Sequence, residues 1–164
     1  MKTMLGSAAV ALLFTSAVAK AVNLPEMTEG LWSIHTQTVA NPGNKKSDNT
    51  STICRSHAYD QYTLDLEKKI KGCSTVNESL QGNKYSIQTH CVMGATVVES
   101  KSNVVFQGSS AAHSESHATY SPALSGITEM SMTQDQKFLG SCPAGAQPGD
   151  LTQTDGTVVH LWKH

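Results

Sequence analysis

Much of the chain alternates between apolar and polar residues over short stretches, a pattern typical of β-strands buried on one face. Residues 30–39 show it clearly, because Trp32 and Ile34 fall on the same side of the stretch. Turns rich in glycine, proline and asparagine separate the stretches. The pattern predicts an all-β fold, an antiparallel meander curled into an open barrel or sandwich. The predicted strands are 30–39, 51–54, the two arms of a hairpin within 73–91, 95–107, 111–120 and 127–134.

Three segments depart from this alternation. The helix formers Glu67-Lys68-Lys69 lie within 64–70, which is predicted to be one short helix before Cys73. Residues 111–120 carry few apolar side chains, which predicts an exposed or edge strand. Residues 143–164 begin with the linker composition PAGAQPG, so they are predicted to form a linker followed by a C-terminal tail or an extra strand.

The hairpin within 73–91 has a cysteine at each end and two candidate registers. A two-residue turn at Gly82-Asn83 gathers most apolar side chains on one face and places Cys91 opposite Ser74. A three-residue turn would place Cys73 opposite Cys91 but would scatter the apolar residues. Because a one-residue slip exchanges the two faces, both features hold only if the strand contains a bulge. We favour the two-residue turn with a bulge or an irregular end near the cysteines.

The N-terminus has the parts of a secretory signal peptide. Lys2 precedes an apolar run that is too short to span a bilayer, and A-x-A motifs predict cleavage after Ala19 or Ala21. No cysteine follows these sites, so a lipid anchor is not indicated. Residues 1–21 are therefore predicted to be a signal peptide and 22–142 a single domain. The predicted location is the periplasm, or the medium, of a Gram-negative bacterium.

The charge balance narrows the classes of partner. Loss of Lys2 and Lys20 with the signal peptide leaves ten basic residues against 13 acidic ones, a net charge near −3. An acidic chain without a basic stripe argues against nucleic acid and anionic membranes as partners. Beyond the signal peptide, no stretch is long and apolar enough to cross a membrane. An unknown protein or a small molecule is the expected partner.

The chain contains four cysteines, which fit two disulfides formed in an oxidising compartment. Four cysteines allow three pairings. The two ends of a hairpin lie close in either register, which favours Cys73–Cys91 and therefore Cys54–Cys142. In a simple up-and-down meander, however, Cys142 falls at the opposite end from the other three. Cys54–Cys73 with Cys91–Cys142 is the alternative.

The order of these features resembles the domain of unknown function 3617 family. The resemblance extends over roughly residues 26–142 and does not include the C-terminal segment. It implies an exported protein, mostly of Gram-negative bacteria, with no established activity. The matching features are Gly30-Leu31-Trp32, Thr52-Ile53-Cys54, Cys73, Gly82-Asn83, Cys91, Met130-Ser131-Met132-Thr133 and Gly140-Ser141-Cys142.

Two groups of side chains are candidate metal ligands. His113 and His117 share one face of a predicted strand but lie about 13 Å apart at that spacing, too far for one ion. A second group has the soft ligands that Cu(I) favours, although methionines on an alternating strand are commonly core residues. Neither group predicts a cofactor. The second group consists of His90, Met93, Met130 and Met132.

No catalytic motif was found in the sequence. There is no G-x-S-x-G elbow, no phosphate-binding glycine loop and no cysteine expected to be free, so the chain is predicted not to be an enzyme. Trp162 is a candidate interaction anchor, because tryptophan concentrates binding energy when it docks. We predict an exported, soluble periplasmic binding or interaction module. The alternatives are an inhibitor or immunity protein against a cell-wall enzyme or toxin, and a copper-binding protein.

Overall fold

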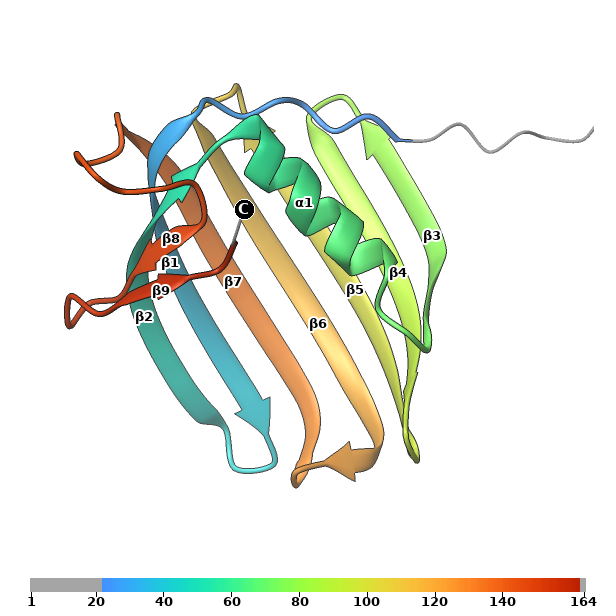
Figure 1. Ribbon diagram of the computed structural model, residues 1–164. Coiled ribbons are helices and arrows are strands. Elements are labelled where there is room, and N and C mark those ends of the chain that lie inside the picture. The colour runs from blue at the N-terminus through green and yellow to red at the C-terminus, as the bar shows by residue number, and fades with distance from the viewer. Residues whose placement is uncertain (1–21, 163–164) are drawn as a thin grey trace, which may run out of the picture.

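The computed structural model describes residues 22–162, which form one nine-stranded antiparallel sheet and one helix (Figure 1). The predicted signal peptide, residues 1–21, lies outside this range. No helix within 22–162 has the length and apolar character needed to cross a membrane. The elements in chain order are β1 Gly30–Asn41, β2 Lys45–Arg55, α1 His57–Lys68, β3 Cys73–Gln81, β4 Lys84–Met93, β5 Thr96–Gln107, β6 Ala111–Leu124, β7 Ile127–Gly140, β8 Asp150–Thr152 and β9 Val158–His160.

The strands follow the order β3-β4-β5-β6-β7-β1-β2-β8-β9 across the sheet. The meander β3 to β7 is joined to the first hairpin through β7, which pairs with β1 along its length. Within the described residues β3 does not pair with β9, so the sheet is open. The predicted fold class, a curled antiparallel sheet with one short helix, is confirmed.

The sheet has two faces. We call the face on which α1 lies the helix face and the opposite one the outer face. α1 lies across one end of the helix face, and β8 and β9 turn over the same side (Figure 1). There Trp162 stacks on Tyr62 of the helix, with 5.8 Å between ring centroids. The sheet therefore curls around α1.

The hydrophobic core lies between α1 and this covered end of the helix face. Trp32 is fully buried and contacts the edge of Phe138, with 5.9 Å between ring centroids. The Arg55 guanidinium lies 4.8 Å from the Trp32 ring centroid and donates to both carboxylate oxygens of Asp60 at 2.9 and 3.0 Å. This pair fixes the first turn of α1 on the sheet. The buried core residues are Met27, Trp32, Ile53, Tyr59 and Ala112.

The helix is longer than predicted and begins earlier, because 64–70 covers only its C-terminal part. Ser56 is the N-cap, and its hydroxyl accepts from the backbone N–H of Tyr59 at 3.2 Å. The chain leaves the helix at Lys69 and turns at Gly72, which has φ +81°. A Cβ at Gly72 would lie 2.5 Å from the carbonyl oxygen of Val92, so this turn requires glycine.

The hairpin of β3 and β4 has both the two-residue turn and the pairing of Cys73 with Cys91, which a regular hairpin could not combine. Gln81 faces Lys84 across a two-residue turn, and Cys73 faces Cys91. The register shifts between Thr75 and Asn77, which makes Val76 the extra residue of a bulge. The predicted two-residue turn with a bulge near the cysteines is confirmed.

The disulfides are Cys54–Cys142 and Cys73–Cys91, the pairing that the sequence favours. α1 carries the chain from one end of the sheet to the other before β3 begins (Figure 1). Cys73 therefore lies at the opposite end from Cys54. Cys142 lies near Cys54 because Leu31 of β1 is paired with Cys54 on one side and with Gly140 on the other.

The predicted edge position of 111–120 is wrong, because β6 lies in the interior of the sheet between β5 and β7. Backbone hydrogen bonds hold a strand whatever its side chains, and small residues such as Ser114 and Ser116 suit a strand on the inside of a curl. The strand also continues past Pro122 to Leu124, after its register with β7 is interrupted beyond Thr119.

The C-terminal segment 143–164 contributes two short strands to the same sheet. β8 pairs with β2, and β9 pairs with β8. The backbone N–H of Gly149 donates to the carbonyl of Cys54 at 2.8 Å and fixes the entry to β8. Of the two predicted alternatives, the structure has the extra strand.

Candidate functional site

The helix face has a second half that neither α1 nor the β8–β9 pair covers. Figure 1 shows α1 over one end of the sheet and no other element over the opposite end. The side chains of this half are partly buried by the curl of the sheet and by one another. We call the part of this surface between α1 and the residues Ala40, Val98 and Tyr120 at its far end the open half. It comprises Thr36, Thr38, Tyr85, Ile87, Thr89, Ser100, Ser102, Ser114, Ser116, Ala118, Met130, Met132 and Gln134.

No residue of the open half is charged. Strand side chains alternate between faces, and the register places the charged residues of β4 to β7 on the outer face. On β6, for example, Ser114, Ser116 and Ala118 are partly buried, whereas Glu115 and His117 are exposed. A charged group bound at the centre of the open half, on β5 to β7, would lose water without gaining an ionic partner, so this part of the surface suits a neutral molecule.

Hydroxyl and amide groups on the open half retain bonding capacity. Gln134 donates from Nε2 to the Thr36 hydroxyl at 3.2 Å, and the hydroxyls of Thr89 and Ser100 are 2.6 Å apart. Among the described residues, the hydroxyls of Ser114 and Ser116 have no hydrogen-bonding partner. These hydroxyls are available to a bound molecule or to water.

One rim of the open half is formed by β3, β4 and the end of α1. The Tyr85 hydroxyl donates to Glu78 Oε1 at 2.8 Å. Burial raises the pKa of Tyr85 well above its usual range, and the acceptor Glu78 adds to this effect. Desolvation raises the pKa of Glu67, whose charge also acts on Tyr85. The Glu67 carboxylate is therefore near this rim.

The structure separates the residues that the sequence grouped as a soft-metal site. Met130 and Met132 lie on the open half, but His90 lies on the outer face, where Nδ1 is 2.6 Å from Glu99 Oε1. Met93 is at the far end of β4 and pairs with Thr96. Within 22–162, no three His, Cys, Asp or Glu side chains are grouped so that they could hold a metal ion.

The outer face carries histidine–carboxylate pairs that the sequence did not indicate. His113 Nδ1 lies 2.7 Å from Asp135 and His117 Nε2 lies 3.3 Å from Glu129, so the two predicted histidines have separate partners. Every histidine within 22–162 lies within 3.6 Å of a carboxylate oxygen. Most of these contacts join residues of two neighbouring strands. They therefore depend on how the strands are paired, which the sequence alone does not give. The six histidines are His35, His57, His90, His113, His117 and His160.

The pair of His113 and Asp135 predicts a pH dependence of stability. The hydrogen bond to Asp135 raises the pKa of His113 above its usual value, although the side chain is exposed. A raised pKa in the folded state adds stability that is complete below about pH 6.5 and is lost as the pH rises through the folded-state pKa. We expect H113Q to lower the urea midpoint at pH 5.5 and to leave it nearly unchanged at pH 9. D135N should reproduce this profile; a pH-independent loss in both variants would contradict the assignment.

Two shallow hollows lie mostly outside the open half, and of its residues only Ser100 lines one of them. One lies along β6 and β7 and includes Ala112 and Phe138 in its lining. The other lies beside Lys101 and His117. Neither brings together the candidate residues of the sequence. The candidate site is therefore the open half, the uncharged surface of the sheet that carries free hydroxyl groups, and not one of these hollows.

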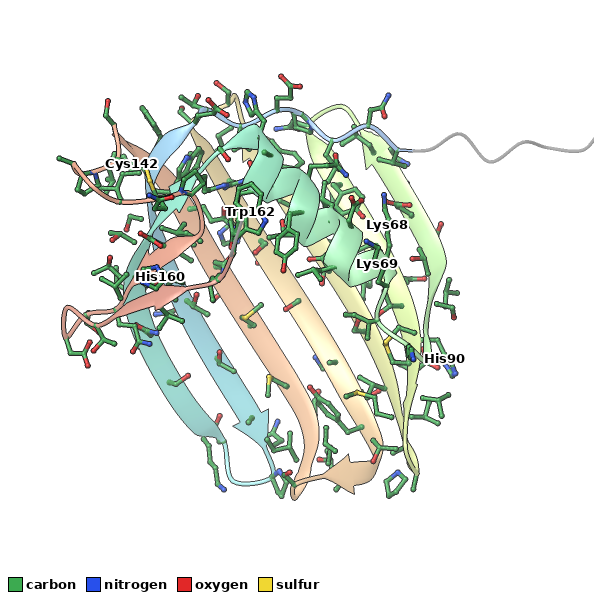
Figure 2. All side chains as sticks on the ribbon, in the orientation of Figure 1. Lys68, Lys69, His90, Cys142, His160 and Trp162 are labelled. Atoms are coloured by element: carbon green, nitrogen blue, oxygen red, sulfur yellow. A yellow bond between two sulfur atoms is a disulfide. The ribbon has the colours of Figure 1, made fainter. Side chains whose placement is uncertain are left out.

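Trp162, the predicted interaction anchor, is partly buried. Its ring stacks on Tyr62 and lies 6.0 Å from the centroid of Tyr59. Figure 2 shows Trp162 beside α1. This packing fastens the C-terminal segment to α1. A role in binding a partner stays a prediction.

Comparison with protein families identifies a matching family model. The family model described as "Protein of unknown function (DUF3617)" matches residues 27–142. The match begins before β1 and ends at Cys142, so it includes α1, both disulfides and the open half, and it leaves out β8 and β9. None of the curated proteins compared with the chain matches it.

Proposed function

The chain belongs to the DUF3617 family of proteins of unknown function, and we propose its function from its own surface. It is an exported, non-enzymatic binding module whose site is the open half of the helix face. Its ligand is a neutral amphiphilic molecule, one that carries both apolar groups and uncharged polar groups.

The observation that carries this proposal is the separation of charge between the two faces. On β4 to β7 and on β1, the acidic and basic side chains, such as Asp135 and His113, lie on the outer face. A sheet face that only water contacts has no need to exclude charge. The uncharged, partly buried open half is the arrangement expected where a neutral molecule covers the sheet.

The side chains of the open half match both parts of such a ligand. Met130, Met132 and Ile87 supply apolar contact, and methionine adapts its shape to an irregular partner. The hydroxyls of Ser114 and Ser116 lie between these apolar groups on the middle strand of the surface. They supply hydrogen bonds that orient the uncharged polar part of the ligand.

Export to an oxidising compartment fits the same function. The predicted signal peptide directs the chain out of the cytoplasm, and two disulfides stabilise a domain in an environment that keeps thiols oxidised. A disulfide-linked sheet offers a rigid surface that binds with little loss of conformational entropy. The absence of a catalytic motif from the sequence favours binding over turnover.

A charge placed at the centre of the open half tests this function. Ser116 lies between Ser102 and Met132, so S116R puts a guanidinium where the ligand would desolvate it. We expect the variant to bind Nile red, a neutral dye whose fluorescence reports an apolar site, at least tenfold more weakly than the wild type. The matched control is T119R on the exposed outer side of the same strand, which should bind normally. Equal affinity of both variants would contradict the proposed site.

A further inference from the structure

Exposed apolar side chains lie where the end of α1, the start of β3 and the end of β4 meet, with Met93 on the helix face of the sheet and Val92 on its outer face. Leu66, Ile70, Val92 and Met93 are 46, 53, 51 and 50% exposed. Backbone bonds hold these segments together, because Gly72 accepts from the N–H of Val92 at 2.7 Å. Large apolar side chains this exposed on converging segments indicate an interaction surface. We call it the α1 corner.

Three lysines lie within four residues of one another in the same segment of the chain as Leu66 and Ile70. Lys68 and Lys69 extend from the C-terminal end of α1 (Figure 2), and Lys71 follows in the turn to β3. All three are exposed, and within the described residues none forms an ion pair. Asp65 and Glu67 precede these lysines, so residues 65–71 carry three positive charges against two negative ones. The α1 corner is thus a positive and apolar surface on a chain that is acidic overall.

We infer that the α1 corner docks on a lipid bilayer that carries anionic headgroups. The apolar side chains would enter the interface, while the flexible lysine chains would reach the headgroup phosphates. A soluble polyanion would use the lysines alone and would leave Ile70 and Met93 in water. The combination of both features favours a bilayer surface.

The three lysines at the α1 corner favour binding to an anionic membrane, although the net charge of the chain is negative. The acidic composition and the lack of a basic stripe in the sequence argue against an anionic membrane as a partner. At physiological salt, charges act over about 8 Å, so the three lysines interact with a nearby surface largely independently of distant carboxylates. Folding also brings the end of β4 to the turn after α1, because the N–H of Val92 donates to Gly72. The inference goes beyond the proposed function and does not require it.

Vesicle binding with matched variants tests the docking surface. K68Q/K69Q removes two charges at the α1 corner, and K45Q/K46Q removes two exposed charges at the start of β2, where no large apolar residue is exposed. On vesicles of equal phosphatidylglycerol and phosphatidylcholine, we expect K68Q/K69Q to bind about 25-fold more weakly, because each lysine contributes about fivefold. The control should bind within about twofold of the wild type. Both variants retain residues 1–21, so any binding by that segment is common to them.

Three outcomes would overturn the inference: no binding of the wild type to these vesicles, equal loss in the two lysine variants, or equal binding to pure phosphatidylcholine. I70S separates a bilayer from a soluble polyanion at constant charge. We expect I70S to bind severalfold more weakly, and an unchanged affinity would indicate charge alone and reject the bilayer. S116R should still bind vesicles, so failure of the proposed function is distinguishable from failure of this one. Circular dichroism confirms that each variant is folded.

Discussion

Replacing Cys54 and Cys142 together by alanine is expected to lower the free energy of unfolding by about 4 kcal/mol. The bridge joins residues 88 positions apart, so it restricts a large part of the unfolded chain. It also ties the end of β2 to the segment after β7, on either side of β1. Urea denaturation of the oxidised protein measures the difference.

The second disulfide provides the matched comparison. Cys73 and Cys91 are 18 positions apart, so the same chain-entropy argument predicts a smaller loss of about 3 kcal/mol for their replacement by alanine. In addition, the hairpin turn already holds these residues close. A larger loss for the Cys73–Cys91 variant than for the Cys54–Cys142 variant would contradict the entropic explanation.

W32A is expected to cost about 4 kcal/mol of unfolding free energy, the middle of the range for replacing a buried aromatic residue by alanine. The indole is fully buried, contacts Phe138 and Arg55, and donates from Nε1 to the carbonyl of Thr28 at 2.8 Å. Its removal leaves a cavity between the sheet and α1. Denaturant unfolding followed by far-ultraviolet circular dichroism measures the loss without relying on tryptophan fluorescence.

Two further variants separate the parts of this effect. W32F keeps an aromatic ring but leaves the Thr28 carbonyl without its donor, so we expect a loss of about 2 kcal/mol. W162A removes a partly buried ring that packs on Tyr62, and its loss should also be smaller than that of W32A. If W162A destabilised the protein more than W32A, the core would have to be centred on the C-terminal segment.

These predictions place most of the stability in the covered half of the helix face. The fully buried side chains Trp32 and Cys54 both belong to that end of the sheet, whereas the open half contains only partly buried residues such as Ser116 and Met132. Substitutions on the open half should therefore affect binding with little change in stability. This division is common in proteins whose binding surface is held by a separate rigid core.

The sequence by itself determined the local features. Alternation predicted the strands around Trp32 and within 127–134, because the period of two is a property of the extended chain. The Gly82-Asn83 turn and the positions of Cys73 and Cys91 together required the bulge that the structure has at Val76. The start of α1 was missed, although Ser56 as an N-cap is a local signal that the sequence contains.

Only the tertiary structure decided which strands are neighbours. β7 pairs with β1, which brings Cys142 to Cys54, and β6 lies inside the sheet although its sequence suggested an edge. Both depend on contacts between residues far apart in the chain, and a strand carries the same local pattern whichever neighbour it has. The uncharged open half arises in the same way: alternation assigns each side chain to one of two faces, but only the pairing register and the position of α1 decide which face is covered.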